Sequence, residues 1–222
     1  YLYPSEEYMF QVLQSEIGEG VLEGLKDAGI VGLTWYDAGA RSFYTAETKV
    51  TKPEDLEGLR IRVQESQLMM DMVEALGASP TPIAWGEVYS ALQTGVVDAG
   101  ENNYPGWYYN SHHEVAPYFV EDEHNRVPEL IIMSKITWDK LSEEDQQIIK
   151  EAAVESTETQ REAWDARTEE AKKLAVEEGA EITTLNAEQK QAFQDKVKGL
   201  YPKYAEGHEE LLNSILEFEM EE

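Results

Sequence analysis

Apolar residues along this chain follow two spacings, one typical of strands and one typical of helices. Segments rich in β-branched and aromatic residues predict strands, and apolar residues three and four positions apart predict helices. The expected strands are residues 30–36, 42–45, 59–63, 96–100, 116–121, 127–134 and 181–185. The expected helices in the first half of the chain are residues 6–13, 20–28 and 68–76. We expect turns at residues 37–39 and around the prolines at positions 80 and 82.

The longest expected element is a helix over residues 142–178. Ser142 and Asp145 have the spacing of a capping box, and Gly179 supplies the stop. No proline or glycine interrupts this segment. A helix of this length exceeds one small domain, so we expect it to brace more than one lobe. Strands alternate with helices before about residue 134 and helices dominate afterwards, which predicts an α/β fold with a helical flank.

The charge of the chain excludes some classes of partner. Its 222 residues include 18 basic and 45 acidic side chains, which gives a formal net charge of −27. Such a chain repels nucleic acid and anionic lipid surfaces. Two interpretations of the acid excess stay open, a solvating coat and an adaptation to high salt. No apolar segment is long enough to insert into a membrane, and no signal peptide is evident, so we expect a mature, trimmed or fragmentary chain.

Candidate binding residues are concentrated between residues 58 and 103. Arg62 lies in an apolar strand, Trp85 follows two prolines, and Glu101, Asn102 and Asn103 close a later strand. In open α/β sheets the ends of strands form ligand sites. A guanidinium beside amides suits a small carboxylate with hydroxyl groups. The alternatives are an ion-paired arginine, a core tryptophan and an ordinary turn.

The sequence predicts no metal and no cofactor. The chain contains no cysteine, which excludes thiolate ligands. His112, His113, Glu114 and His124 match no metal-ligand spacing, so turn or capping roles are favoured, although His124 lies at a possible sheet end. Neither a nucleophile elbow nor a phosphate-binding glycine loop occurs. An enzyme is therefore unsupported, and its candidate acid and base would be Glu101 and His124.

Three long segments resemble one transport family. They read PEDLEGLRIRV, LGASPTPIAWGEVYSALQTGVVDAGEN and VPELIIMSKITWDKLSEEDQQII. This pattern resembles the DctP-like solute-binding proteins of tripartite ATP-independent periplasmic (TRAP) transporters. The resemblance implies a periplasmic, non-enzymatic protein with two α/β lobes that close over a small organic anion and then dock on membrane permease subunits. It also implies that residues 1–36 complete the N-terminal lobe, residues 37–133 form mainly the second lobe with hinge strands, and residues 134–222 pack on both.

The same resemblance assigns roles to individual residues. It implies that Arg62 pairs with the ligand carboxylate, and that Trp85 and Asn102 contact the ligand. Arg41 in GARSF matches a second basic position, and His124 matches a position on the ligand side.

The ligand suggested by this resemblance is a hexuronate, such as glucuronate or galacturonate. The segments AGENNYP, HHEVAPYF and DEHNRVPE are similar to the hexuronate-binding branch. Most members have proline at the position of Asn103. We expect Asn103, together with Asn102, to form hydrogen bonds with sugar hydroxyl groups. The alternatives are a dicarboxylate or a sialic-acid-like sugar. The family normally begins with a further N-terminal segment, which precedes Tyr1 and would add contacts to the pocket.

Overall fold

The computed structural model describes residues 1–220, and the chain divides into two compact units. Unit 1 contains Tyr1, residues 40–125 and residues 168–209. Unit 2 contains residues 2–39, residues 126–167 and the segment from residue 210 onward. Each unit is therefore assembled from segments far apart in the sequence. How the two units correspond to the lobes expected from the family stays a prediction.

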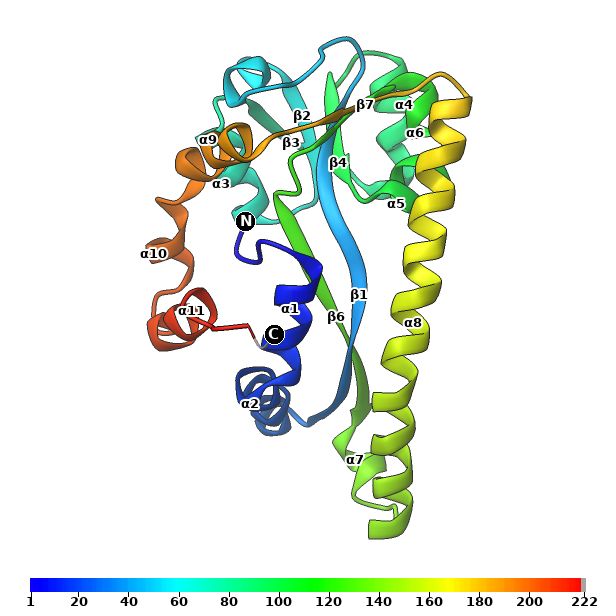
Figure 1. Cartoon of the computed structure of the whole chain (residues 1–222), viewed down its shortest axis with the longest axis vertical. Coiled ribbons are helices and arrows are strands. Elements are labelled where there is room, and N and C mark those ends of the chain that lie inside the picture. Colours follow the sequence, from blue (N-terminus) through cyan, green and yellow to red (C-terminus); the bar gives the residue numbers. More distant parts are fainter. Residues whose placement is uncertain (221–222) are drawn as a thin grey trace. The chain divides into compact units, whose positions relative to one another are not determined.

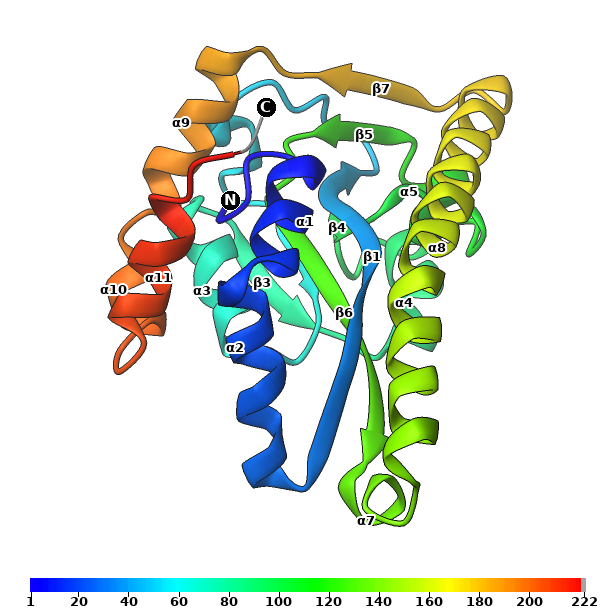
Figure 2. The same ribbon diagram turned by 60° about the horizontal axis from the view of Figure 1, so that its bottom comes forward.

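Unit 1 is built on a mixed sheet with the strand order β3-β2-β4-β1-β5-β7. Strand β2 pairs in parallel with both β3 and β4, whereas β1 runs antiparallel to both β4 and β5 (Figure 1). Strands β5 and β7 pair in parallel and lie side by side (Figure 2). The strands are β1 (Ile30–Thr45), β2 (Arg60–Val63), β3 (Ser79–Pro82), β4 (Ala99–Asn102), β5 (Tyr118–Glu121) and β7 (Glu181–Thr184).

Helices of unit 1 form two apolar cores with this sheet. One core gathers side chains of β1, β2, α3 and α9 around Phe43, Leu56 and Phe193, which are fully buried. The other surrounds Trp107 and Tyr44, also fully buried. The helices are α3 (Gln67–Ala75), α4 (Val88–Gln93), α5 (Tyr104–Tyr108), α6 (His112–Val115), α9 (Ala187–Val197) and α10 (Leu200–Tyr204), with short 3-10 turns at η2 (Pro53–Leu56) and η3 (Trp85–Glu87).

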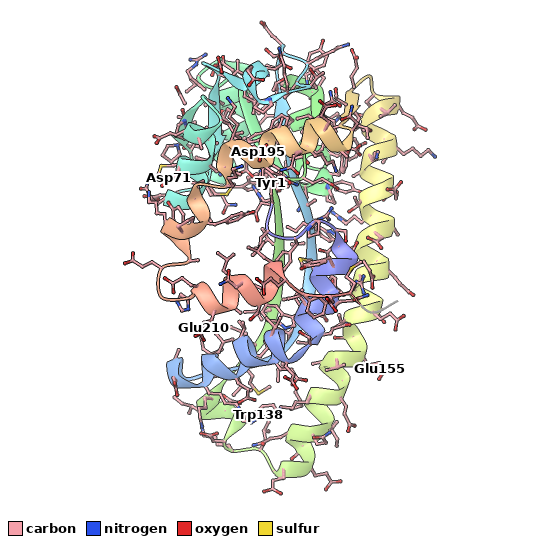
Figure 3. All side chains as sticks on the ribbon, turned by 60° about the vertical axis from the view of Figure 1, so that its left-hand side comes forward. Tyr1, Asp71, Trp138, Glu155, Asp195 and Glu210 are labelled. Atoms are coloured by element: carbon pink, nitrogen blue, oxygen red, sulfur yellow. The ribbon has the colours of Figure 1, made fainter. Side chains whose placement is uncertain are left out.

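Unit 2 combines the first part of β1, which pairs with β6, and several helices. Met9, Phe10, Leu13 and Trp35 form one core, and Trp138, labelled in Figure 3, packs with residues of β1 in a second. The elements are α1 (Glu6–Gln14), α2 (Glu16–Gly24), η1 (Leu25–Ala28), β6 (Asn125–Ser134), α7 (Lys135–Trp138) and α11 (Glu209–Leu216).

The long helix α8 (Glu143–Glu177) contributes residues to both units. At its start the backbone N–H of Asp145 donates to the Ser142 hydroxyl oxygen at 3.1 Å, which confirms the predicted N-cap. Gly179, with a φ of 99°, follows its end, as the sequence predicted. The predicted long helix is therefore confirmed to within one residue at each end.

Three local predictions were wrong. The turn expected at residues 37–39 does not form, because β1 continues through Gly39. Gly39 adopts a φ of 73°, which glycine tolerates because it has no Cβ. The strand expected at 96–100 begins three residues later, since the backbone N–H groups of Val96 and Val97 donate to Ala91 and complete the end of α4. The proline segment is not a turn but strand β3, at the end of the strand order, where missing N–H donors are tolerated.

Candidate ligand-binding site

Arg62 brings a buried guanidinium to the end of β2, and only 3% of the residue is exposed. Its Nε and Nη2 donate hydrogen bonds to the carbonyl oxygen of Ile83, at 2.9 and 2.8 Å. Its Nη1 is buried without a hydrogen-bond partner among residues 1–220. Burial also lowers the pKa of Arg62, because the charged form loses hydration. A buried cation with an unsatisfied donor is a place where an anion would be stabilised.

Trp85 lies directly over this guanidinium and remains 40% exposed. Its ring centroid is 5.5 Å from the Arg62 guanidinium carbon and 5.1 Å from the His112 ring. The indole follows β3 on the turn η3, whose approach is restricted by Pro82. An exposed aromatic face beside a buried cation offers a surface on which an apolar sugar face can stack.

Arg41 does not present a free guanidinium, because it is bound to Glu101. Its Nε and Nη2 donate to the two carboxylate oxygens at 2.5 and 2.8 Å, and Nη2 also donates to the Glu101 carbonyl at 3.0 Å. Its Nη1 donates to Asn102 Oδ1 at 3.1 Å. The register of β1 on β4 places these residues together, since Ser42 lies opposite Asn102. The pair is therefore part of the sheet, with Glu101 fully buried and Arg41 12% exposed.

His124 extends this network to a second carboxylate. Its Nδ1 lies 2.8 Å from Asp122 Oδ2 and its Nε2 lies 3.5 Å from Glu101 Oε2, and the imidazole is fully buried. Burial alone would lower the pKa of His124, but Asp122 and Glu101 outweigh it and raise the pKa. For Glu101, burial opposes ionisation, yet His124 and Arg41 hold the pKa of its carboxyl below the usual range. The side chains of Arg41, Glu101, Asp122 and His124 thus form a buried ionic network.

His112 contacts Tyr44 and the ring of Trp85 and lies near enough to Arg62 to be affected by its charge. Its Nδ1 lies 2.9 Å from the Tyr44 hydroxyl, and burial together with the nearby Arg62 lowers the pKa of His112 to about 4. Tyr44 fits only because Gly100 has no side chain, since a Cβ there would lie 2.7 Å from the hydroxyl oxygen. His112 is therefore uncharged at neutral pH and does not compete with Arg62 for an anion.

The two asparagines have different surroundings. Asn102 is buried in β4, and its Oδ1 accepts from Arg41 and from the backbone N–H of Asn103. Gly106 leaves room for that side chain, because a Cβ there would come within 2.6 Å of the Asn102 amide carbon. The Oδ1 of Asn103 accepts from the Gly106 N–H at 2.7 Å and so caps α5.

The seven residues that the sequence selected all lie in unit 1: Arg41, Arg62, Trp85, Glu101, Asn102, Asn103 and His124. The structure connects Arg41, Glu101, Asn102 and His124 through hydrogen bonds, and it pairs Arg62 with Trp85. Sequence reasoning missed the contributions of Asp122, Tyr44 and His112. Asp122 lies only two residues before His124, which was a local signal, but no spacing links Tyr44 and His112 to the others, because β1 and α6 meet only after folding.

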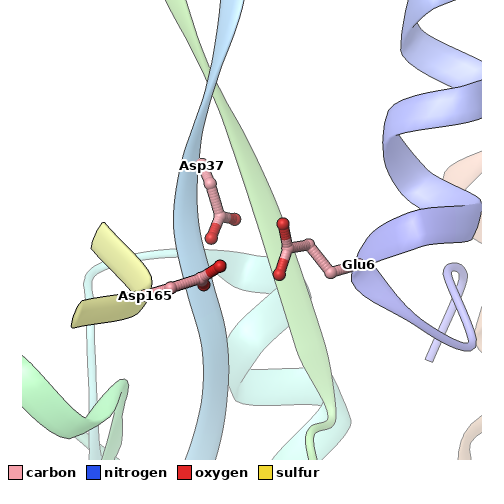
Figure 4. Close-up of side chains that lie close together, drawn as sticks. All are labelled: Glu6, Asp37 and Asp165. Atoms are coloured by element: carbon pink, nitrogen blue, oxygen red, sulfur yellow. The ribbon is translucent and has the colours of Figure 1, made fainter. Parts of the chain in front are cut away.

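Unit 2 contains a separate group of acidic side chains, Glu6, Asp37 and Asp165, which point toward one another (Figure 4). One oxygen of each lies within 4.8 Å of the others. Arg161 already donates two hydrogen bonds to Glu6, at 3.0 and 2.8 Å. Asp37 Oδ1 accepts the Gly39 N–H at 2.9 Å, so both carboxylates have protein partners. These contacts give the group a structural role.

Ionisation of Asp37 in this acidic group is expected to destabilise the folded protein at neutral pH. Burial raises the pKa of Asp37, and Glu6 and Asp165 add to the shift. A raised pKa means that the folded state prefers protonated Asp37. The stability that Asp37 contributes is therefore fully present at low pH and is lost as the pH rises through the pKa of the folded state. Asp37→Asn should therefore raise the melting temperature at pH 7 by up to a few degrees, and the gain should vanish below the ordinary aspartate pKa, about 3.9.

The measurement is thermal unfolding of both proteins between pH 3 and pH 8. Asp139→Asn is the matched control in the same unit, because Asp139 is exposed and pairs with Lys135, four residues earlier. A destabilising Asp37→Asn substitution at pH 7 would contradict the expected cost.

Comparison with known proteins shows the family to which this chain belongs. The model of bacterial extracellular solute-binding proteins, family 7 (DctP), matches residues 1–207. The chain belongs to this family. Family 7 is a family of solute-binding transport proteins found outside the cytoplasm, in agreement with the class and the location that the sequence predicted. Within residues 1–220, no helix combines the length and the apolar character that a bilayer span requires.

Solved TRAP solute-binding proteins are similar to the chain over nearly its whole length. One from Bradyrhizobium, in complex with galacturonate, is 41% identical, with a TM-score of 0.88, covering 98% of this chain and 72% of that one. One from Chromohalobacter salexigens, with bound glucuronate, is 36% identical, with a TM-score of 0.91, covering 97% and 72%. One from Shewanella oneidensis, with bound succinate, is 25% identical, with a TM-score of 0.87, covering 97% and 71%. The predicted mixed α/β fold is confirmed by this likeness.

The chain spans only part of its curated relatives. A solute-binding protein of Chromohalobacter salexigens is 35% identical over 99% of this chain, and the chain covers 65% of that relative.

Proposed function

We propose that this family 7 protein captures a hexuronate, glucuronate or galacturonate, for a TRAP transporter. The observation that carries the proposal is the unpaired Nη1 of the buried Arg62 beneath the exposed ring of Trp85. A hexuronate combines one carboxylate for the guanidinium with an apolar sugar face for the indole. Similar proteins hold galacturonate and glucuronate, which supports the same ligand class here.

The other residues of the site then have supporting roles in the proposal. Asn102 and Asn103 are assigned to the sugar hydroxyls, Arg41 and Glu101 hold the Asn102 amide in place, and His124 holds Glu101. Closure of the two expected lobes over the ligand, and docking of the closed form on membrane permease subunits, are proposed from membership of the family.

A dicarboxylate is the second candidate. The Shewanella protein holds succinate in the same fold, so the fold alone does not decide between the two ligands. The exposed Trp85 favours the sugar acid, because succinate has no ring face to stack on an indole.

A ligand panel tests this proposal directly. Purified protein is examined by native mass spectrometry for a carried ligand and then by thermal shift with glucuronate, galacturonate, succinate and a sialic acid. Near saturation, at about 100 times the dissociation constant, binding adds roughly 2.7 kcal/mol to the free energy of unfolding. A shift with succinate and none with either hexuronate would replace the proposed ligand by a dicarboxylate.

Trp85 also provides a spectroscopic test of ligand position. It is 40% exposed, whereas Trp35, Trp107 and Trp138 are at least nine-tenths buried, and the partly buried Trp164 belongs to unit 2. Addition of galacturonate should change the tryptophan emission, since the sugar replaces water on the exposed indole. Trp85→Phe should remove most of that change and weaken binding about tenfold, in line with the energies of aromatic contacts.

Trp138→Phe is the matched control, because Trp138 lies in unit 2 and is buried among apolar side chains. An unchanged emission response in Trp85→Phe would place the ligand away from this ring.

A further inference from the structure

The indole of Trp85 is exposed and lies on a short element. The turn η3 contains three residues, and 40% of Trp85 is exposed. A side chain in such a place samples several rotamers unless its neighbours restrict it. Ordering one side chain only when the ligand arrives lowers the affinity by about twofold to tenfold. The contacts that hold the indole in the unliganded protein therefore bear on how tightly a sugar binds.

His112 provides such a contact. The centroid of its ring lies 5.1 Å from that of Trp85, with 59° between the two planes, which is within the range of favourable aromatic pairs. The histidine itself is buried. Because burial and the nearby Arg62 lower the pKa of His112 to about 4, the imidazole is neutral at pH 7 and adds no second positive charge beside the guanidinium.

Tyr44 in turn fixes the imidazole. Its hydroxyl oxygen lies 2.9 Å from His112 Nδ1 in a buried contact. Tyr44 is fully buried, and its ring is stacked on that of Phe119 in the apolar core of unit 1. A continuous series of contacts therefore leads from this core through Tyr44 and His112 to the exposed indole of Trp85.

Building on the proposed capture of a hexuronate, we propose that His112 is a positioning residue for Trp85. Its ring, held by the Tyr44 hydroxyl, keeps the indole over the Arg62 guanidinium before the ligand arrives. Trp85 contacts the sugar, and His112 acts through Trp85. This role is distinct from the turn or capping role that the sequence favours for His112.

A double-mutant cycle separates action through Trp85 from other effects of the same substitution. Isothermal titration calorimetry at pH 7 measures the galacturonate affinity of the wild-type protein, His112→Ala, Trp85→Ala and the double variant. We expect His112→Ala to weaken binding about fivefold when Trp85 is present and less than twofold when it is absent. An equal loss in both backgrounds, or no loss in either, would overturn the positioning role.

His113→Ala is the matched control for this cycle. His113 is the next residue of α6 and is also buried, but its Nε2 lies 2.8 Å from Glu178 and its ring contacts are with Trp107 and Tyr108. We expect its galacturonate affinity to stay within twofold of the wild-type value. A fivefold loss in His113→Ala as well would trace the effect to a general disturbance of α6 and would refute a specific role for His112.

Tyr44→Phe tests the hydroxyl while keeping the ring and its packing. We expect a loss of galacturonate affinity that is smaller than in His112→Ala and that disappears when Trp85 is replaced by alanine. Wild-type affinity in Tyr44→Phe would remove the hydroxyl from the proposal. Circular dichroism establishes whether each variant folds. Should His112→Ala fail to fold, His112→Asn replaces it, because its amide can still bond to Tyr44 but offers no ring.

Acrylamide quenching of tryptophan emission examines the same role without a ligand. The contribution of Trp85 is the difference between proteins with and without Trp85→Phe. Loss of the neighbouring ring uncovers the indole, so this contribution should become more easily quenched in His112→Ala and stay unchanged in His113→Ala. Unchanged quenching in His112→Ala would contradict the positioning role.

The outcomes also separate this role from the proposed function. Galacturonate binding without coupling between His112 and Trp85 would refute the positioning role and leave hexuronate capture standing. If the wild-type protein binds neither glucuronate nor galacturonate, hexuronate capture is refuted, and the quenching comparison alone decides whether His112 positions the indole.

Discussion

Arg62→Ala is expected to lose hexuronate binding by well over tenfold while the protein stays folded. Removing the partner of a desolvated carboxylate costs roughly 2–5 kcal/mol of binding free energy. The loss should be visible in calorimetry and as a smaller ligand-induced thermal shift. Folding should be retained, since within residues 1–220 the hydrogen bonds of the guanidinium end on the Ile83 carbonyl, and its contact with Trp85 involves a partly exposed ring.

Two further variants test whether the loss of affinity is specific to the guanidinium of Arg62. Arg62→Lys keeps the charge but loses the planar fork, so it should recover only part of the affinity. Arg60→Ala is the matched control, because Arg60 lies two residues earlier on the same strand and forms an exposed pair with Asp98. Wild-type affinity in Arg62→Ala would show that the carboxylate binds elsewhere.

Glu101→Ala is expected to have the largest effect on stability. The substitution removes the counter-charge of Arg41 and one neighbour of His124 in a fully buried network. Breaking a buried ion pair by removing one partner typically costs about 3–5 kcal/mol. Urea unfolding followed by circular dichroism should therefore show a much lower midpoint.

Glu181→Ala is the control for this loss, because its pair with Lys49 is more than half exposed on both sides and should contribute little. Equal midpoints for the two variants would mean that Arg41 and His124 find other partners when Glu101 is absent.

Urea unfolding of the wild-type protein and Glu101→Ala at lower pH adds a second check. The lowered pKa of Glu101 means that its contribution is present above the ordinary glutamate pKa and is lost as the pH falls through the folded value.

Local helical signals in the sequence were reliable because they act over a few residues. The N-cap of α8 at Ser142 forms as the sequence predicted, and the structure shows that α9 begins with a capping box formed by Asn186 and Gln189. Gly77 and Gly179 adopt the positive φ values that end helices. These interactions need no partner from elsewhere in the chain.

Predictions of strands and turns were less reliable, because a strand is defined by its neighbours. Gly39 looks like part of a turn, yet β1 continues through it and pairs with β6 on one stretch and with β4 and β5 on another. Pro80 and Pro82 look like turn residues, yet β2 pairs with them at the edge of the sheet. Only the assembled sheet supplies these partners.

The sequence by itself determined the family, the α/β class, the long helix and the set of candidate residues around Arg62 and Trp85. Only the tertiary structure decided how their charges are distributed. The register of β1 on β4 neutralises Arg41 with Glu101, while Arg62 meets a neutral carbonyl from the segment after β3. Charge balance depends on distances of a few ångströms between segments far apart in the chain, and a linear pattern of residue types does not contain those distances.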